Sequence, residues 1–203
     1  MPRPLPPLDI EIELSGAGFF SVAGIDEAGR GPLFGPLVVG AVIVDIQNPP
    51  EAYDSKTITR RRRDELAASV RHCAVAHSTG VVSAGEIDSH GMSWALAQGV
   101  QRAVAGLDCA PDFLLIDGPH DLSKGLLPSR RLVKGELRSR SIAAASLIAK
   151  TERDSLVDVL AAQYPGYGLE AHGGYGTPAH IEALRRLGPT PQHRHSFSPI
   201  KGR

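Results

Sequence analysis

Four acidic residues occupy the same kind of position in the sequence, each at the end of a short segment typical of a β-strand: Asp26, Glu27, Asp117 and Glu136. The ends of neighbouring strands in an open sheet can converge, and carboxylates that close raise one another's pKa unless a cation lies between them. Oxygen ligands without His or Cys favour Mg²⁺ or Mn²⁺ over zinc. Such a cluster suits phosphodiester hydrolysis by two metal ions, one activating water and the other stabilising the leaving oxygen.

The loop after the first two acids is rich in glycine and proline, over the stretch Gly29–Pro36. Neighbouring residues of a strand point to opposite faces, so Asp26 and Glu27 can share a ligand only if the backbone turns or bulges at Ala28 and Gly29. The alternative interpretation is a strand followed by an ordinary loop whose acids are solvated. For Asp117, the alternative is a carboxylate that caps the turn at Gly118.

The elements that must position these residues follow from the apolar pattern and the turn residues. Segments with strand character cover residues 19–25, 37–44, 74–83, 113–116 and 131–136. Segments with helical character cover residues 60–71, 91–106, 141–163 and 178–187. The first two strands are joined by the glycine and proline loop, so they are expected to form an antiparallel pair. Thr59 is expected to cap the first helix.

Positive charge gathers in three places. Arg60–Arg63 form a run at a predicted helix start, and residues 123–153 carry eight Lys and Arg against two acids. Both can bind phosphate, although a run of arginines is also typical of a solvated face. In the tail, His193, Arg194 and His195 lack a regular metal-ligand spacing. A phosphate-side or solvated patch is the preferred interpretation there, with a metal cluster as the alternative.

Composition indicates a globular protein in a reducing compartment. The chain has 203 residues, of which 42% are hydrophobic, with 22 Lys and Arg against 22 Asp and Glu. It has no apolar run near the roughly 20 residues that a membrane helix needs. The first residues are too proline-rich for a signal peptide. Cys73 and Cys109 match no metal-ligand spacing. We therefore expect a cytoplasmic protein that does not enter a membrane.

The spaced motifs of the chain resemble those of the ribonuclease HII family, in the family's order and over roughly residues 19–200. Seven motifs carry this resemblance: Gly24–Pro36, Asp54–Lys56, Leu115–Gly118, Lys134–Glu136, Ala144–Asp154, Gly174–Thr177 and His193–Phe197. The resemblance implies a ribonuclease-H-like α/β fold, a mixed five-stranded sheet flanked by helices, with a small helical C-terminal part. The expected division is a flexible lead-in over residues 1–18, a catalytic domain over 19–164 and a C-terminal extension over 165–203.

The resemblance also implies an activity and a substrate. The family cleaves the RNA strand of RNA–DNA hybrids and incises 5′ to a single ribonucleotide in duplex DNA, leaving 3′-hydroxyl and 5′-phosphate ends. Carried over by position, the four acids hold two Mg²⁺ or Mn²⁺ ions, and Gly29, Arg30 and Gly31 contact the 2′-hydroxyl and its phosphate. Tyr175 packs on the next deoxyribose. The candidates for backbone phosphates are Ser55, Lys56, Ser146, Lys150 and Arg153. A monomer is expected.

Two positions depart from the family pattern. Glu136 stands where the family generally has Asp, and the extra methylene lengthens its reach by about 1.5 Å. Because the octahedral shell of Mg²⁺ is strict, we expect Glu136 to ligate with altered activity or a tilt toward Mn²⁺. Pro119 stands where the family often has Asn, which bears on the conformation of that loop.

Two other functions are compatible with the same residues. One is a nucleic-acid-binding protein of this fold whose cutting is impaired by Glu136, although the presence of all four acids argues against it. The other is a relative restricted to long hybrids, like ribonuclease HI or ribonuclease HIII. Gly29–Gly31 together with Tyr175 favour the enzyme that incises at a single ribonucleotide.

Overall fold

Five strands form one mixed sheet in the computed structural model, which describes residues 4–201 apart from the side chain of Lys56. The strands are β1 (Val22–Ala28), β2 (Leu37–Ile43), β3 (Ala76–Val82), β4 (Phe113–Asp117) and β5 (Ser129–Leu132). Their order across the sheet is β3-β2-β1-β4-β5. The pairs β1–β2 and β2–β3 are antiparallel, whereas β1–β4 and β4–β5 are parallel. The predicted mixed sheet and its first antiparallel pair are therefore confirmed.

The strand register brings two of the acids to the same end of two adjacent interior strands. Ile25 pairs with Ile116 in the parallel ladder of β1 and β4. The next residues along each strand are Asp26 and Asp117, so the two carboxylates leave adjacent strands at the same level. On the other side β1 stays regularly paired with β2 as far as Ala28. Asp26 and Glu27 thus lie inside the strand, and the chain turns only after it.

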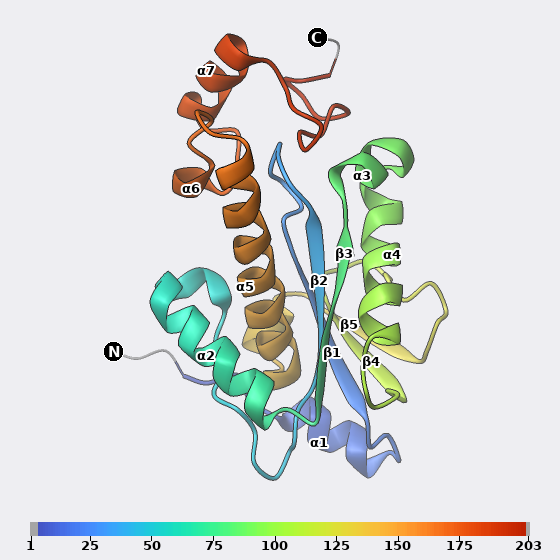
Figure 1. The fold of residues 1–203 in the computed structure, drawn as a ribbon. Helices are drawn as coiled ribbons and strands as arrows, with labels where there is room; N and C mark the ends of the chain where they lie inside the picture. Colours follow the sequence, from blue (N-terminus) through green and yellow to red (C-terminus); the bar gives the residue numbers. More distant parts are fainter. Residues whose placement is uncertain (1–3, 202–203) are drawn as a thin grey trace.

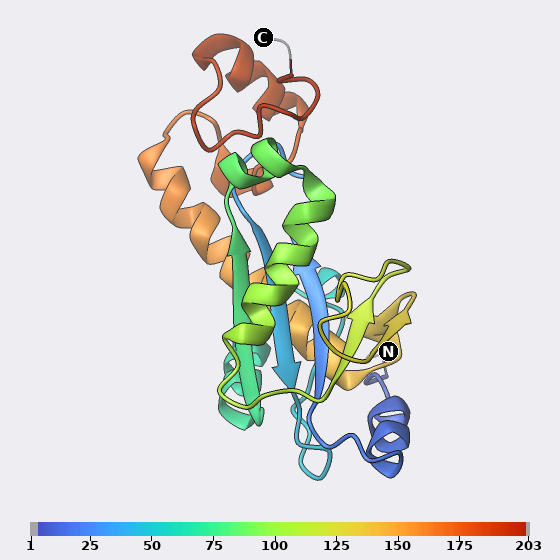
Figure 2. The same ribbon diagram turned by 90° about the vertical axis from the view of Figure 1, so that its right-hand side faces the viewer.

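Helices cover both faces of the sheet (Figure 1). They are α1 (Asp9–Gly16), α2 (Arg60–Cys73), α3 (Ala84–His90), α4 (Met92–Ala105), α5 (Arg140–Gln163), α6 (Leu169–His172) and α7 (Pro178–Leu187), with short 3₁₀ turns η1 (Ser55–Thr57) and η2 (Gly135–Leu137). The long α5 crosses one face with α2 packed beside it, and α4 covers the opposite face (Figures 1 and 2). The apolar core lies between these layers.

Glycines let α5 approach the central strands closely. A Cβ atom on Gly24 would lie 2.1 Å from the carbonyl carbon of Ser141, and one on Gly40 would lie 2.4 Å from the carbonyl oxygen of Ala145. Any side chain at either position would push the helix away from the sheet. This contact places the start of α5 directly over the strand that carries Asp26.

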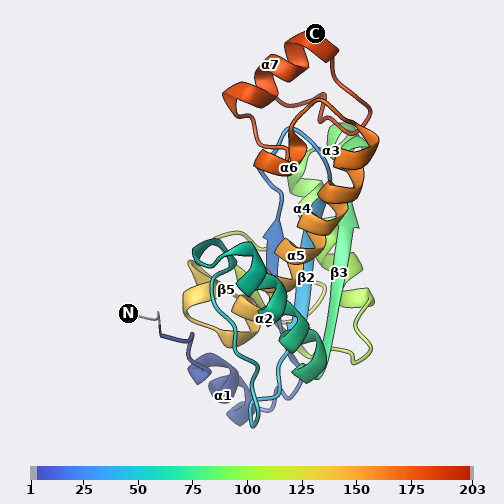
Figure 3. The same cartoon turned by 60° about the vertical axis from the view of Figure 1, so that its left-hand side comes forward.

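The C-terminal elements pack on the loop between β1 and β2. Helices α6 and α7 lie at the end of the molecule opposite α1 (Figure 3). Their apolar residues, among them Leu169 and Leu184, surround the fully buried Phe34 of that loop. The loop with the proposed substrate-reading glycines is therefore held between the sheet and the C-terminal part.

Several expectations about local structure are wrong. Residues 9–16 of the predicted flexible lead-in form α1, which is fixed by the buried Glu11. The predicted strand over 131–136 ends at Leu132, and η2 follows because Lys134 adopts a left-handed conformation with φ of 55°. The helices α3 and α6 were not predicted. Within the described residues, no helix is long and apolar enough to span a membrane.

Candidate active site

Asp26 is the buried centre of the acidic cluster. Only 3% of its surface is exposed, and its Oδ1 accepts a hydrogen bond of 2.8 Å from the backbone N–H of Glu27. Burial raises the pKa of the Asp26 carboxyl well above its usual value, and the charges of Glu27 and Asp117 raise it further. Hydrogen bonds from Ser146 and from the Glu27 backbone oppose this rise in pKa only in part. The site thus concentrates negative charge where little water can screen it.

The turn that carries Glu136 is tied to Asp117 by a backbone contact at Gly135. Oδ1 of Asp117 accepts a hydrogen bond of 2.7 Å from the N–H of Gly135, which ties the turn η2 to the end of β4. A Cβ atom on Gly135 would lie 3.1 Å from that oxygen and 2.6 Å from Ile142, so the close approach needs glycine. Glu136 follows directly and is buried. The turn, and not a strand end, therefore brings Glu136 beside Asp117.

The four acids are chemically suited to binding a hard divalent cation. All four are carboxylates, and a cation between them would relieve the repulsion that raises the pKa of Asp26. In the conformation described for residues 4–201, no three Asp, Glu, His or Cys side chains are grouped closely enough to hold a metal ion. The backbone thus gathers the four acids in one region, and holding an ion would require their side chains to turn toward one another.

Two serines lie behind Asp26 instead of facing the solvent. The hydroxyls of Ser55 and Ser146 are 2.9 Å apart, and both residues are only 3% exposed. Ser146 also hydrogen-bonds the Asp26 carboxylate. The expectation that these two serines contact phosphate is therefore at odds with their burial. Ser146 contacts Asp26 directly, and Ser55 contacts Ser146.

The predicted phosphate contacts separate into different environments. Lys150 is partly exposed and pairs with Asp154 at 2.6 Å. It lines a cavity of about 240 Å³ together with Arg60 and Tyr175. The side chain of Lys56 lies outside the described part of the chain. The ammonium group of Lys150 thus lies where it could contact the phosphate backbone of a nucleic acid.

Arg153 is fully buried and holds backbone carbonyls. Its Nε donates to the carbonyl of Pro36 at 3.2 Å, and its Nη2 donates to Phe34 and Gly173 at 3.2 and 3.1 Å. Burial lowers the pKa of the guanidinium. The prediction that Arg153 contacts phosphate directly is wrong, because its donors face the protein interior.

Gly31 and Tyr175 lie next to each other at the surface. A Cβ atom on Gly31 would lie 3.8 Å from Cε1 of Tyr175, and 47% of the Tyr175 surface is exposed. Arg30 between the two glycines has a side chain that is 52% exposed and lies 3.7 Å from the carboxylate of Glu27. The structure therefore brings the glycine loop, the exposed aromatic ring and the acidic cluster together.

The three tail residues His193, Arg194 and His195 do not form a metal cluster, and they do not form a single solvated patch. His193 and Arg194 are fully buried, and only His195 is exposed. His193 hydrogen-bonds His180, while Arg194 binds carbonyls of the loop between β1 and β2. Sequence reasoning missed this role because buried, unpaired cationic side chains are rare. The only signal in the sequence was that His193–Phe197 resembles a motif of the ribonuclease HII family.

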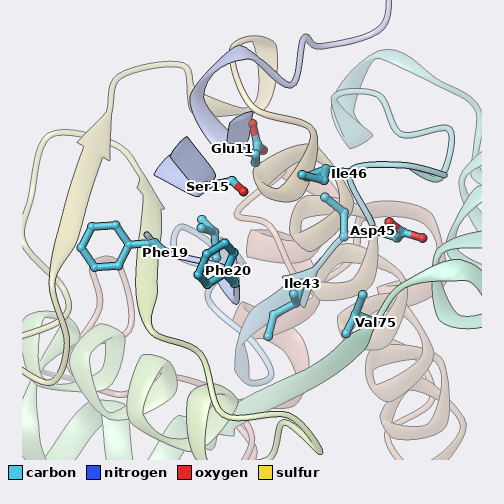
Figure 4. Close-up of a pocket in the computed structure, with 10 residues that line it drawn as sticks. Glu11, Ser15, Phe19, Phe20, Ile43, Asp45, Ile46 and Val75 are labelled. Carbon is cyan, nitrogen blue, oxygen red and sulfur yellow. The ribbon is translucent and has the colours of Figure 1, made fainter. Parts of the chain in front are cut away.

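A second cavity lies between α1 and the end of β2 (Figure 4). It encloses about 130 Å³ and is lined by Glu11 and Asp45 together with apolar side chains such as Phe20 and Ile43. Ile43 pairs with Ala23, three residues before Asp26 on β1. The cavity is therefore separate from the acidic cluster.

A ribonuclease-H-like sheet with carboxylates gathered on its adjacent central strands β1 and β4 and on the turn η2 defines the class: a nuclease of the ribonuclease H fold. Comparisons with known proteins agree. The family model for ribonuclease HII matches residues 23–200. The chain is 47% identical over 196 residues to ribonuclease HII of Geobacillus thermodenitrificans, covering 94% of this chain and 73% of that protein.

Two further similarities extend this result. The chain is 48% identical to ribonuclease HII of Geobacillus kaustophilus over 196 residues, covering 94% of this chain and 73% of that protein. Its fold is similar to the crystal structure of ribonuclease H2 from Pyrococcus horikoshii, with a TM-score of 0.77, 27% identity and coverage of 89% and 95% of the two chains. The chain belongs to the ribonuclease HII family. It is accordingly a type 2 ribonuclease H, a metal-dependent endonuclease of RNA–DNA hybrids.

Proposed function

We propose that this enzyme also incises duplex DNA on the 5′ side of a single embedded ribonucleotide, leaving 3′-hydroxyl and 5′-phosphate ends. The observation that supports the proposal most directly is the proximity of Tyr175 to Gly31, in the loop that follows the strand of the buried Asp26. The 2′-hydroxyl is the one group that marks a ribonucleotide among deoxyribonucleotides. A backbone without side chains can approach it closely.

Two Mg²⁺ or Mn²⁺ ions would be held by the four acids Asp26, Glu27, Asp117 and Glu136. When bound there, the ions would supply activation of the attacking water and charge stabilisation at the leaving oxygen. The protein's own part is to fix the carboxylates: Ser146 and the Glu27 backbone orient Asp26, and the Gly135 N–H orients Asp117. The rise in the pKa of Asp26 supports this assignment, because a bound cation would reverse it.

The substrate would lie across the glycine loop. Gly29–Gly31 would contact the 2′-hydroxyl and the adjacent phosphate, and Tyr175 would pack on the deoxyribose on the 3′ side. Lys56 and Lys150 would meet backbone phosphates, which position the duplex without reading its sequence. We further propose that the enzyme acts in the cytoplasm as a monomer, with its catalytic domain over residues 19–164 and its extension over 165–203.

A cleavage assay tests the proposal. Labelled duplex DNA with one ribonucleotide is incubated with Mg²⁺ or Mn²⁺ and with the wild type, Asp26→Asn or the control Asp108→Asn. Asp108 is an exposed residue in the connection that leads into the far end of β4. Incision by the wild type and Asp108→Asn, lost in Asp26→Asn, is expected. Tight binding without incision by the wild type would favour a binding protein, and incision only within longer RNA runs would favour an enzyme restricted to hybrids.

A further inference from the structure

Arg194 is a fully buried cation whose side-chain donors bind only backbone carbonyls. Its Nη2 donates to the carbonyls of Gly29 at 2.6 Å and Gly35 at 2.9 Å, its Nη1 to Arg30 at 3.1 Å, and its Nε to Gly35 at 3.1 Å. No carboxylate of the described residues forms a salt bridge with it. Burial and the charge of Arg153 lower the pKa of Arg194 to about 10, so it stays charged at neutral pH. A buried charge is costly, which calls for a reason to retain it.

The contacts of Arg194 fix which way the peptide groups of the glycine loop point. In a planar trans peptide, the carbonyl of one residue and the N–H of the next point in opposite directions. The carbonyls of Gly29 and Arg30 face the buried guanidinium. The N–H groups of Arg30 and Gly31 must therefore point away from it. Within residues 4–201, no backbone or side-chain acceptor binds either N–H.

The second half of the loop, over residues 33–36, is held by a separate set of hydrogen bonds. Arg153 on α5 binds the carbonyls of Phe34 and Pro36, and the backbone N–H of Arg194 donates to Leu33 at 2.7 Å. Gly29 itself has φ of 94°, a left-handed conformation that favours glycine. Each end of the loop is thus anchored, and Gly31 between the anchors lies beside the exposed ring of Tyr175.

We propose that Arg194 is a positioning residue that aims the N–H groups of Arg30 and Gly31 at the ribonucleotide. The acceptors would be its 2′-hydroxyl oxygen and an adjacent phosphate oxygen. This inference rests on the proposed function, and it assigns the discrimination between ribose and deoxyribose to a residue that does not touch the substrate. Without the guanidinium, the peptide groups can rotate, and both donors lose their alignment.

A binding experiment separates this role from a merely structural one. In the Asp26→Asn background, affinities are measured by fluorescence anisotropy for a duplex with one ribonucleotide and for the same duplex made of DNA alone. Arg194→Lys keeps the charge but provides one ammonium in place of the planar guanidinium. It is expected to lower the preference for the ribonucleotide by about tenfold, the effect of losing one or two aligned hydrogen bonds. Affinity for the all-DNA duplex should change little.

The control is Arg185→Lys, since Arg185 lies in the same C-terminal part but is exposed and pairs with Glu182 at 3.2 Å. It should keep the full preference. A folded Arg194→Lys protein that retains the preference would overturn the inference while leaving the proposed function intact. Equal binding of both duplexes by the Asp26→Asn protein with Arg194 present would overturn the proposed function and the inference with it.

Amide hydrogen exchange provides a test that needs no substitution at Arg194, in case the variant does not fold. In the Asp26→Asn protein, the amides of Arg30 and Gly31 should exchange rapidly when free. They should be protected by the ribonucleotide duplex and much less by the all-DNA duplex. Equal protection by both duplexes, or full protection in the free protein, would contradict the inference.

Discussion

Nε2 of His193 lies 3.1 Å from Nε2 of His180, and both residues are fully buried. The backbone N–H of Thr190 donates to Nδ1 of His193 at 2.9 Å, so the proton of His193 must be on Nε2. His193 therefore donates to His180, whose own proton is on Nδ1 and points to the carbonyl of Tyr175 at 2.9 Å. This chain of hydrogen bonds needs both rings to be neutral, and it ends on the backbone of Tyr175.

Acid should destabilise the protein through this histidine pair. Burial first, and then the charges of His180 and His195, lower the pKa of His193 to about 4 from an ordinary value of 6.5. The unfolded chain binds this proton from about pH 6.5 downward, but the folded protein only near pH 4. The free energy of unfolding should therefore fall by roughly 3 kcal/mol between these values.

Urea unfolding at pH 7.5 and pH 4.5 measures this contribution. His193→Gln should be less stable at both values but should lose less stability on acidification than the wild type. His120→Gln, which alters an exposed histidine, should keep the wild-type pH dependence. If the wild type and His193→Gln lost equal stability, the low pKa of His193 would be wrong.

Glu11→Gln should destabilise the protein by loosening α1 from α5. Oε1 of Glu11 accepts bonds from Ser139 Oγ at 2.7 Å, Ser141 N at 3.0 Å and Ser141 Oγ at 2.7 Å. These contacts place a buried carboxylate at the N-terminus of α5, where negative charge is favourable. We expect a loss of about 1–3 kcal/mol by urea unfolding. The exposed Glu13→Gln on the same helix serves as the control and should change stability little. Comparable losses for the two variants would contradict the role of Glu11.

Gly29→Ala should damage the loop, whereas Gly31→Ala should not. A Cβ atom on Gly29 would lie 2.1 Å from Nε of the buried Arg153 and 2.7 Å from the carbonyl oxygen of Pro36, at a φ of 94°. On Gly31 the nearest neighbour is 3.8 Å away. We expect Gly29→Ala to lose more than about 1 kcal/mol of stability and most of its activity. Thermal unfolding with equal midpoints for both variants would contradict this account.

Glu136→Asp should shift the metal preference. Glu136 follows Gly135, whose N–H donates a hydrogen bond to Asp117. The backbone position of Glu136 is therefore fixed, and the length of the Glu136 side chain decides how far its carboxylate reaches. Since Mg²⁺ tolerates less distortion of its shell than Mn²⁺ does, the shorter side chain should raise the ratio of the Mg²⁺ rate to the Mn²⁺ rate several-fold. Unchanged rates with both metals would indicate that Glu136 does not ligate.

Local patterns predicted much of the fold. The apolar run at residues 37–44 contains β2, which ends one residue earlier at Ile43, and Thr59 caps α2 by accepting a bond from the N–H of Arg62 at 3.3 Å. The predicted end of α5 at Gln163 is confirmed, where proline and glycine follow. Periodicity and turn chemistry are properties of neighbouring residues, so the sequence displays them directly.

Features that depend on distant partners could not be predicted. Lys134 takes a left-handed conformation, which few residues other than glycine adopt, and so the position of Glu136 on a turn was hidden. Arg153 and Arg194 are buried, and carbonyls far along the chain accept hydrogen bonds from them. Basic residues are ordinarily exposed, so the sequence alone indicated phosphate contacts for Arg153.

The most direct test of the central claim is to map the ends produced from a duplex with one ribonucleotide. The substrate is compared with the same duplex carrying a 2′-O-methyl group at that position, which blocks close approach of the glycine loop. We expect one incision 5′ to the ribonucleotide, a 3′-hydroxyl that a DNA polymerase can extend, and no incision of the methylated duplex. Incision on the 3′ side, equal cutting of both duplexes, or no cutting with either Mg²⁺ or Mn²⁺ would contradict it.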